Sequence, residues 1–565
     1  METQNENSIN GVEKFFTNDN NYIEYFFEVG IRPDFFSDKT ITPDLSPEKI
    51  NSKLVPEIIS KFPYFDKKTM TIDSSIIDFI FPKGFKAIMS PNKPSEEFYT
   101  LILDNPFYNS DYSYKYIGCL VIYESLNIYK KLYDSSYSES DPTKDLTKSK
   151  DDFKNIYIPK CLCLASVHPK IKNFELILRA IYSLVLNGKN YFIDSIIEKL
   201  ICQIPKIPRG IKNIFLKIDK EKINLTETKL NELSTVNVDL KIIFSNFKIE
   251  KIVEIFKLIL FETKVIFFCS KINEITNYIL CFMLLLKPFT YQYRILSTLP
   301  KKCYCFLEDN SPNIFGVNEI YNKNFFQVNN LIIGKEPICI VDLDKKDYYM
   351  INKSIKNFPT IPKHLKDKLD KRIEEYRKSK KKAGDKNEDY QEIFYRFMIN
   401  LLKDYPKFLK KNAFESNKLQ DIFDKQGYIN SQSNSDKEFY DKITNSQMFL
   451  NLIIKRLIPR DTKEKIQALF LEEKINVKLA QKKIIGGNKI LGQNILLPSK
   501  EFDYQKNPEI IDLTGDNPYT KLSNETINFF SKENINKEIC FSKGYIVREG
   551  QTKSELYFEY YLFPE

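Results

Sequence analysis

Two short runs in the middle of the chain are apolar on both faces of a strand. KVIFF, within 264–270, and ICIV, within 337–344, combine β-branched and aromatic side chains and are bounded by polar residues. A strand of this kind needs cover on both sides, which is typical of parallel sheets flanked by helices. Helical apolar patterns at 248–262 and 274–286 lie beside these runs. The alternation therefore predicts an α/β domain with a mostly parallel sheet.

The N-terminal quarter of the chain has a different pattern. Short strand-like runs at 75–82, 96–104 and 114–126 are separated by polar segments and turns, including FPKG at 81–84. Short strands joined in this way favour an antiparallel sheet. IYIPKCLCLAS (156–166) is predicted to be another strand, and we assign it to the α/β domain because it is apolar along its length.

The C-terminal third of the chain is predicted to be largely helical. KHLKDKLDKRIEEYRKSKKK (363–382) has the charge of an exposed helix, and the runs at 390–405 and 438–457 are amphipathic. Further on, IIGGNKILGQ (484–493) is interpreted as a flexible joint, and the run at 554–563 is strand-like.

Charge and composition argue against several classes of protein. The chain has 565 residues, and 85 Lys and Arg against 75 Asp and Glu give a formal net charge of only +10. The densest basic run, at 376–386, is flanked by acidic residues and is interpreted as a solvated linker rather than a nucleic-acid surface. The N-terminal METQNENSIN lacks the apolar centre of a secretory signal, and YILCFMLLL (278–286) is shorter than the ~20 residues of a membrane span. With ten cysteines scattered through apolar runs, the sequence predicts a soluble cytoplasmic protein.

The sequence contains no recognisable motif of a small-molecule enzyme. It has no P-loop, GxGxxG, HExxH, GxSxG or CxxC motif, and His168 and His364 are its only histidines. His364 stands at the start of a charged helix. His168 follows a strand in a loop, where α/β proteins place functional groups, although a structural role is the favoured interpretation. We therefore expect no covalent chemistry and a role in recognising another macromolecule.

Paired cysteines raise a metal site as one alternative. Cys161 and Cys163 stand at i and i+2 of a predicted strand, so their side chains point to the same face. Cys303 and Cys305 form a second such pair, and four thiolates, or three with an imidazole, suit zinc. Both pairs lie among apolar residues, so buried packing is the favoured interpretation. The two carboxylates of VDLD (341–344) could hold Mg²⁺ but are weak evidence alone. No metal or other cofactor is predicted.

In their order along the chain, several segments resemble those of the DENN-domain family. IYIPKCLCLASVHP (156–169) is similar to the family's tyrosine–valine–proline–lysine–alanine–leucine–cysteine–leucine–serine segment, and 236–276 to its helix–strand–helix centre. KPFTYQYRILSTLP (287–300) resembles the proline–phenylalanine–x–tryptophan segment, with Tyr291 where tryptophan is common. SPNIFGV (311–317) and VDLD follow in the family's order, and FMINLLKDYPKFL and FYDKITNSQMFLNLIIKRL resemble its last helices.

The resemblance covers roughly residues 20–460 and implies a fold of two lobes. An N-terminal longin-like module would hold an antiparallel sheet with helices. A C-terminal lobe would join an α/β core with a mostly parallel sheet to an all-helical part. The expected divisions are a disordered N-terminus (1–20), an upstream module (21–134), a linker (135–152), the α/β core (153–345), a charged helix and linker (346–389), a downstream helical module (390–465) and a C-terminal extension (466–565).

The resemblance also implies a function and a partner. The chain is expected to be a guanine-nucleotide exchange factor that promotes GDP release from a Rab-type small GTPase in membrane trafficking. It is expected to bind no nucleic acid, and any association with endomembrane vesicles would be peripheral. The residues expected to contact the GTPase stand in loops and at strand ends of the core: Ser270, Asn273, Tyr291, Gln292, Phe315, Gly316, Asn318, Asp342 and Asp344.

Structural roles are the alternative for several of these residues. Ser270 or Asn273 could cap the following helix, Gly316 could serve a turn, and Tyr291 could belong to the core. For the whole protein, the alternatives are a DENN-fold scaffold or effector that binds a GTPase or trafficking partner without exchange, and a nucleotide-using α/β enzyme. The C-terminal extension could inhibit the core, complete it or bind another protein.

Overall fold

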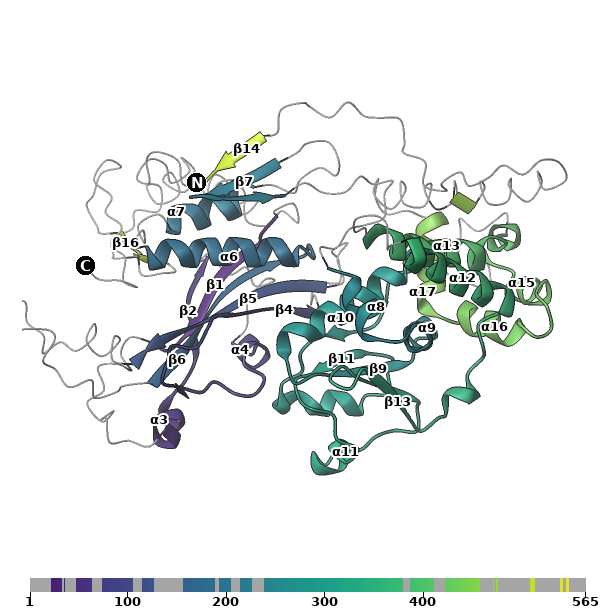
Figure 1. The fold of residues 1–565 in the computed structure, drawn as a ribbon, viewed down its shortest axis with the longest axis horizontal. Helices are drawn as coiled ribbons and strands as arrows, with labels where there is room; N and C mark the ends of the chain where they lie inside the picture. The colour runs from purple at the N-terminus through teal and green to yellow at the C-terminus, as the bar shows by residue number, and fades with distance from the viewer. Residues whose placement is uncertain are drawn as a thin grey trace, which may run out of the picture.

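The protein is described by a computed structural model, in which two lobes and a helical module follow one another along the chain (Figure 1). The N-terminal lobe ends at residue 225, the core lobe spans 238–358, and the helical module spans 363–457. The runs at 484–493 and 554–563 lie outside the described residues. The structure describes residues 22–32, 35, 47–62, 74–104, 114–126, 156–187, 193–204, 214–225, 238–379, 387–410, 422–457, 471, 474–475, 509–513, 539–541 and 545–547.

The N-terminal lobe is built on an antiparallel sheet with strand order β2-β1-β6-β5-β4, to which β3 adds by pairing with β6. The helix α6 crosses one face of this sheet (Figure 1), and α4 covers the other. Its elements are β1 (Tyr25–Gly30), α3 (Pro47–Lys53), β2 (Glu57–Phe62), α4 (Ile76–Ile80), β3 (Ile88–Met89), β4 (Glu97–Asp104), β5 (Tyr114–Ser125), β6 (Ile156–Ser166), α6 (Ile171–Leu186), α7 (Ile193–Glu198), η2 (Lys199–Gln203), β7 (Ile214–Ile218) and β8 (Glu221–Asn224).

Two sequence predictions for this lobe are wrong. The run at 75–82 is not a strand, because its apolar Ile76 and Ile80 lie four residues apart and are both buried by the helix α4. The run at 156–166 is a strand, but it pairs antiparallel with β1 and β5 rather than joining the parallel sheet. It is apolar along its length because this antiparallel sheet is covered on both faces, by α6 on one and by α4 on the other.

The core lobe contains the predicted α/β arrangement. Its sheet has the order β10-β11-β9-β12-β13, in which only β13 runs antiparallel to its neighbour. The helices α8, α9 and α10 pack on one face, and η3 and α11 on the other. Its elements are α8 (Lys241–Asn246), α9 (Ile249–Leu260), β9 (Lys264–Phe268), α10 (Ile272–Leu285), β10 (Ile295–Leu296), η3 (Lys301–Glu308), β11 (Ile314–Val317), α11 (Phe325–Val328), β12 (Ile338–Asp342), β13 (Asp347–Ile351) and η4 (Ile355–Asn357).

The helical module differs from its prediction in two details. Leu365, Leu369 and Ile373 on α12 are buried, so one face of this charged helix packs into the core. The run at 438–457 forms two helices, because the Ser446 hydroxyl accepts the N–H of Phe449 and starts a new one. The elements are α12 (Lys363–Ser379), α13 (Asn387–Leu402), η5 (Tyr405–Phe408), α15 (Lys425–Asn430), α16 (Lys437–Thr444) and α17 (Gln447–Leu457).

Part of the C-terminal extension returns to the N-terminal lobe. The strand β14 (Glu509–Asp512) pairs in parallel with β7 (Figure 1), and Leu513 is buried in the same apolar cluster as α6. Two further strands, β15 (Ile539–Phe541) and β16 (Tyr545–Val547), pair with each other. Among the described residues, no helix combines the length and apolar composition needed to cross a membrane.

The two lobes are joined along the edge strand β4. The N–H of Ser297, just after β10, donates to the carbonyl of Ile102 at 3.1 Å, and the Ser297 hydroxyl accepts the N–H of Ile102 at 2.7 Å. The hydroxyl of Thr276 on α10 donates to the carbonyl of Thr100. Backbone atoms of β4 are therefore fixed directly to the core lobe.

Candidate functional site

The carboxyl ends of β9, β11 and β12 meet at one edge of the core sheet. There the backbone N–H and the hydroxyl of Ser270 donate to the Asp344 carboxylate at 2.9 and 2.8 Å. The side-chain amide of Asn318 donates to the carbonyls of Cys269 and Ser270 at 3.0 and 3.1 Å. Three residues predicted from separate segments thus form one hydrogen-bonded cluster. With Asn273 and Asp342 they make up what we call the carboxyl-edge surface.

Asp342 is the most deeply buried member of the carboxyl-edge surface. It is 0% exposed, and its carboxylate accepts the backbone N–H of Lys345 at 3.0 Å and pairs with the Lys345 ammonium at 2.9 Å. That lysine is itself largely exposed. Asp342 therefore positions Lys345 and the turn that carries Asp344, and it offers no side-chain surface to a partner.

Neither Ser270 nor Asn273 caps the helix α10. The residue before the first helical turn is Lys271, and no side-chain hydrogen bond closes this end. The Ser270 hydroxyl is used by Asp344 instead, while Asn273 is exposed on the first turn of the helix. Capping, the alternative role for these two residues, is therefore wrong.

The other expected contact residues lie elsewhere. Tyr291 is 2% exposed and its hydroxyl donates to the carbonyl of Pro312, at the opposite edge of the sheet, while the neighbouring Gln292 is exposed there. Phe315 and Gly316 are buried inside β11. The structure does not bring these four residues to the carboxyl-edge surface, and a GTPase-binding role for them stays a prediction.

A second feature, which the sequence did not indicate, lies where the lobes meet. We call it the interlobe groove; it has a volume of about 520 Å³. Both lobes contribute lining residues, and Lys83, in the turn after α4 of the N-terminal lobe, also donates to the carbonyl of Ser270 in the core lobe at 3.4 Å. The groove is lined by Ser95–Thr100 of the β4 segment, Ile171, Glu175 and Arg179 of α6, and Asn273 and Asn277 of α10. Asn273 therefore belongs to both the groove and the carboxyl-edge surface.

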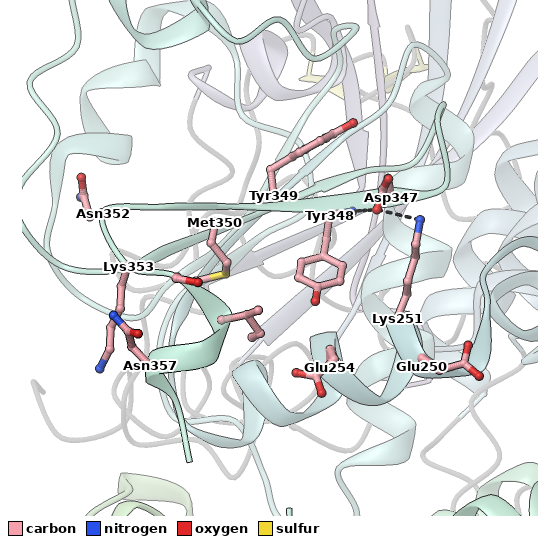
Figure 2. Close-up of a pocket in the computed structure, with 12 residues that line it drawn as sticks. Glu250, Lys251, Glu254, Asp347, Tyr348, Tyr349, Met350, Asn352, Lys353 and Asn357 are labelled. Atoms are coloured by element: carbon pink, nitrogen blue, oxygen red, sulfur yellow. Dashed lines mark hydrogen bonds and ion pairs between the residues drawn. The ribbon is translucent and has the colours of Figure 1, made fainter. Parts of the chain in front are cut away.

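A larger and more open groove, of about 830 Å³, lies between β13 and α9 (Figure 2). Figure 2 shows Lys251 pairing with Asp347 across it, at 2.7 Å. Tyr348 points from β13 toward Glu254, and burial raises the pKa of Tyr348 to about 12. None of the expected contact residues lines this groove, so it is not part of the candidate site.

The cysteine pair on β6 gains a third thiol that the sequence did not indicate. Cys119 lies opposite Cys163 in the β5–β6 register, and the Sγ atoms of Cys119, Cys161 and Cys163 all lie within 4.8 Å of one another. Burial raises the pKa of Cys161 and Cys163 well above the usual value. Burial acts in the same direction on Cys119, but hydrogen bonds from the other two thiols lower its pKa to about 6.

The donors around this cluster argue against zinc. All three thiols are 0% exposed, and among the described residues no fourth His, Cys, Asp or Glu joins them, whereas a structural zinc site uses four ligands. The second cysteine pair lies in η3 of the core lobe, where Cys305 is exposed, and does not join them. His168 stacks on Tyr22, and His364 lies 3.9 Å from Asp436, both away from the cluster.

Comparison with known proteins supports the family resemblance. Residues 157–346 match the model of the DENN (AEX-3) domain. A DENN domain-containing protein of Schizosaccharomyces pombe is 23% identical over 231 residues, which is 38% of this chain. The chain spans 23% of the length of that relative. These two matches support a DENN domain over residues 157–346, as the sequence resemblance predicted. The matched segment begins at β6, so it includes a central strand of the N-terminal lobe as well as the core sheet.

Proposed function

We propose that this protein promotes GDP release from a Rab-type small GTPase in membrane trafficking. The observation that supports the proposal is the DENN domain at 157–346, a family whose partners are generally small GTPases. Within it, the exposed Asn273 and Asp344 lie at one sheet edge beside the junction of the lobes. A partner docked there contacts both lobes.

The proposed mechanism needs no covalent step. An exchange factor binds the nucleotide-free GTPase more tightly than the loaded form, and by linkage it weakens nucleotide binding by the same factor. A standard interface buries about 1,200–2,000 Å² in total, and the carboxyl-edge surface is proposed as one part of it. Asp344, held in place by Ser270, is an exposed acceptor for N–H groups of an open switch loop.

Release of fluorescent GDP from a panel of loaded Rab GTPases, including those of the source organism, tests the proposal. Acceleration of at least one Rab is expected. A protein that binds a Rab without accelerating release is a scaffold or effector, and one that does neither is not a regulator of those GTPases. We further propose that the protein acts in the cytoplasm and reaches endomembrane vesicles peripherally; fractionation of cell extracts with and without a salt wash checks this.

A further inference from the structure

The interlobe groove contains a buried hydroxyl that has no hydrogen-bond partner. Thr100 on β4 is 3% exposed and lines the groove. Its backbone carbonyl accepts a hydrogen bond from Thr276, but its Oγ1 has no partner among the residues that the structure describes. A buried hydroxyl without a partner costs free energy. A ligand that supplies a partner to this atom is therefore favoured.

The groups around Thr100 present free acceptor oxygens as well as unused N–H donors of Arg179. Arg179 bonds to one oxygen of Glu96 at 3.1 Å and to one oxygen of Glu175 at 3.0 Å. Within the described residues, the second oxygen of each carboxylate makes no hydrogen bond. The side-chain nitrogen of Asn277 donates to the carbonyl of Asn273 at 3.2 Å, which leaves its amide oxygen to accept. These oxygens match a ligand that carries several N–H donors.

The formal charge of the groove points to the same ligand. Glu96, Glu97 and Glu175 line it, with Arg179 as the single cation. Burial raises the pKa of Glu97, and the positive charge of Lys83 only partly opposes this. A second cation in the groove would therefore be stabilised by the excess of carboxylates.

We propose that the interlobe groove receives one lysine or arginine side chain of the GTPase, whose cationic group donates hydrogen bonds to the Thr100 hydroxyl and to the free oxygens of Glu96 and Glu175. This inference rests on the proposed function and adds the chemistry of one contact to it. Asn273 borders both the groove and the carboxyl-edge surface, so a partner docked on that surface reaches the groove.

The first test is Thr100→Val, which replaces the hydroxyl by a methyl group of nearly the same size. The affinity for the responding Rab in its nucleotide-free form, measured by calorimetry, is expected to fall about tenfold or more, since a hydrogen bond to a charged group is lost. The melting temperature of the free protein is expected to stay equal or rise, because the buried hydroxyl had no partner. A purely structural role would leave the affinity unchanged.

The second test removes charge at the rim of the groove. The double variant Glu96→Gln and Glu175→Gln is expected to lower the association rate and to weaken its dependence on salt concentration. Glu438→Gln, an exposed glutamate on α16 in the helical module, is the matched control and is expected to behave as wild type. A Glu175→Lys variant is expected to recover affinity when one basic residue of the Rab is changed to glutamate.

The outcomes separate this inference from the function on which it rests. If the wild-type protein accelerates GDP release but Thr100→Val and the double glutamine variant bind the Rab as tightly as wild type, the groove inference is wrong and the exchange function stands. If the wild-type protein binds none of the Rabs in nucleotide-free form, both are wrong.

Discussion

Substitution of Gly316 by alanine is expected to loosen the joint between the two lobes. A Cβ atom at this position would lie 1.9 Å from the backbone oxygen of Ser297 and 2.6 Å from Cγ2 of Ile275. The first of these atoms belongs to the backbone and cannot rotate away, so the segment around Ser297 has to move. Ser297 makes the two hydrogen bonds with Ile102 that join β4 to the core lobe. A clash inside β11 is thus transmitted to the interlobe junction.

The size of the effect follows from these contacts. Overpacking a well-packed site costs about 1–3 kcal/mol, and each of the two hydrogen bonds contributes about 0.5–1.5 kcal/mol. Loss of both would give a total of about 2–6 kcal/mol. Thermal unfolding should show a lower melting temperature, and hydrogen exchange should show faster exchange at the amides of Ile102 and of Leu299, which donates to the Gly316 carbonyl at 2.7 Å.

A matched glycine variant controls for the loss of backbone freedom. At Gly30 an added Cβ would meet Cδ1 of Ile59 at 3.2 Å, and a side-chain end can shift by that amount. Gly30→Ala is therefore expected to cost less than about 1 kcal/mol. The reasoning is refuted if Gly316→Ala stays within about 0.5 kcal/mol of wild type and leaves exchange at Ile102 unchanged, because the joint would then not depend on this close approach.

Three further predictions concern individual side chains. Glu262→Ala is expected to destabilise the docking of α17 by about 1 kcal/mol in urea unfolding, because its carboxylate accepts the first two N–H groups of that helix. Glu262→Gln should cost less, because burial raises the pKa of Glu262 and so penalises the charged carboxylate more in the folded than in the unfolded chain. This penalty is present above the raised pKa and is relieved as the pH falls through it. Asp344→Ala is expected to slow GDP release at least about tenfold with a small change in melting temperature. Brief labelling of the native protein with iodoacetamide, followed by peptide mass mapping, should modify exposed Cys305 before buried Cys163, whose pKa is raised by burial.

The elements of the core lobe could be predicted because their patterns are local. The strand at 264–268 is a short run buried at every position, and the helices on either side of it have apolar residues at a helical spacing that can be counted along the chain. The sheet to which a strand belongs is not a local property. A run apolar on both faces indicates only that both faces are covered, and at 156–166 the cover is α6 on one side and α4 on the other. From the sequence, the strand at 156–166 is assigned to the parallel sheet because its apolar pattern does not show which elements cover it.

In the candidate site, too, some features follow from local sequence patterns and others do not. Residues that follow parallel strands must meet at one edge of the sheet, so Ser270, Asn318 and Asp344 could be expected together from the strand pattern and the family resemblance. The resemblance does not separate residues kept for packing from residues kept for contact. Tyr291 shows the difficulty: its ring is buried and its hydroxyl donates to the carbonyl of Pro312, so it packs within the core lobe, and its predicted GTPase contact stays a prediction.

The interlobe groove could not be found from the sequence because no single segment carries it. Thr100 is an ordinary strand residue, and its significance depends on a hydroxyl left without a partner when α6 and α10 close around β4. Of the GTPase-contact residues expected from the sequence, Asn273 alone lines this groove. If a basic side chain of the GTPase enters there, the exchange surface includes the N-terminal lobe. A change that moves β4 relative to the core, such as Gly316→Ala, should then weaken GTPase binding although Gly316 itself is buried inside β11.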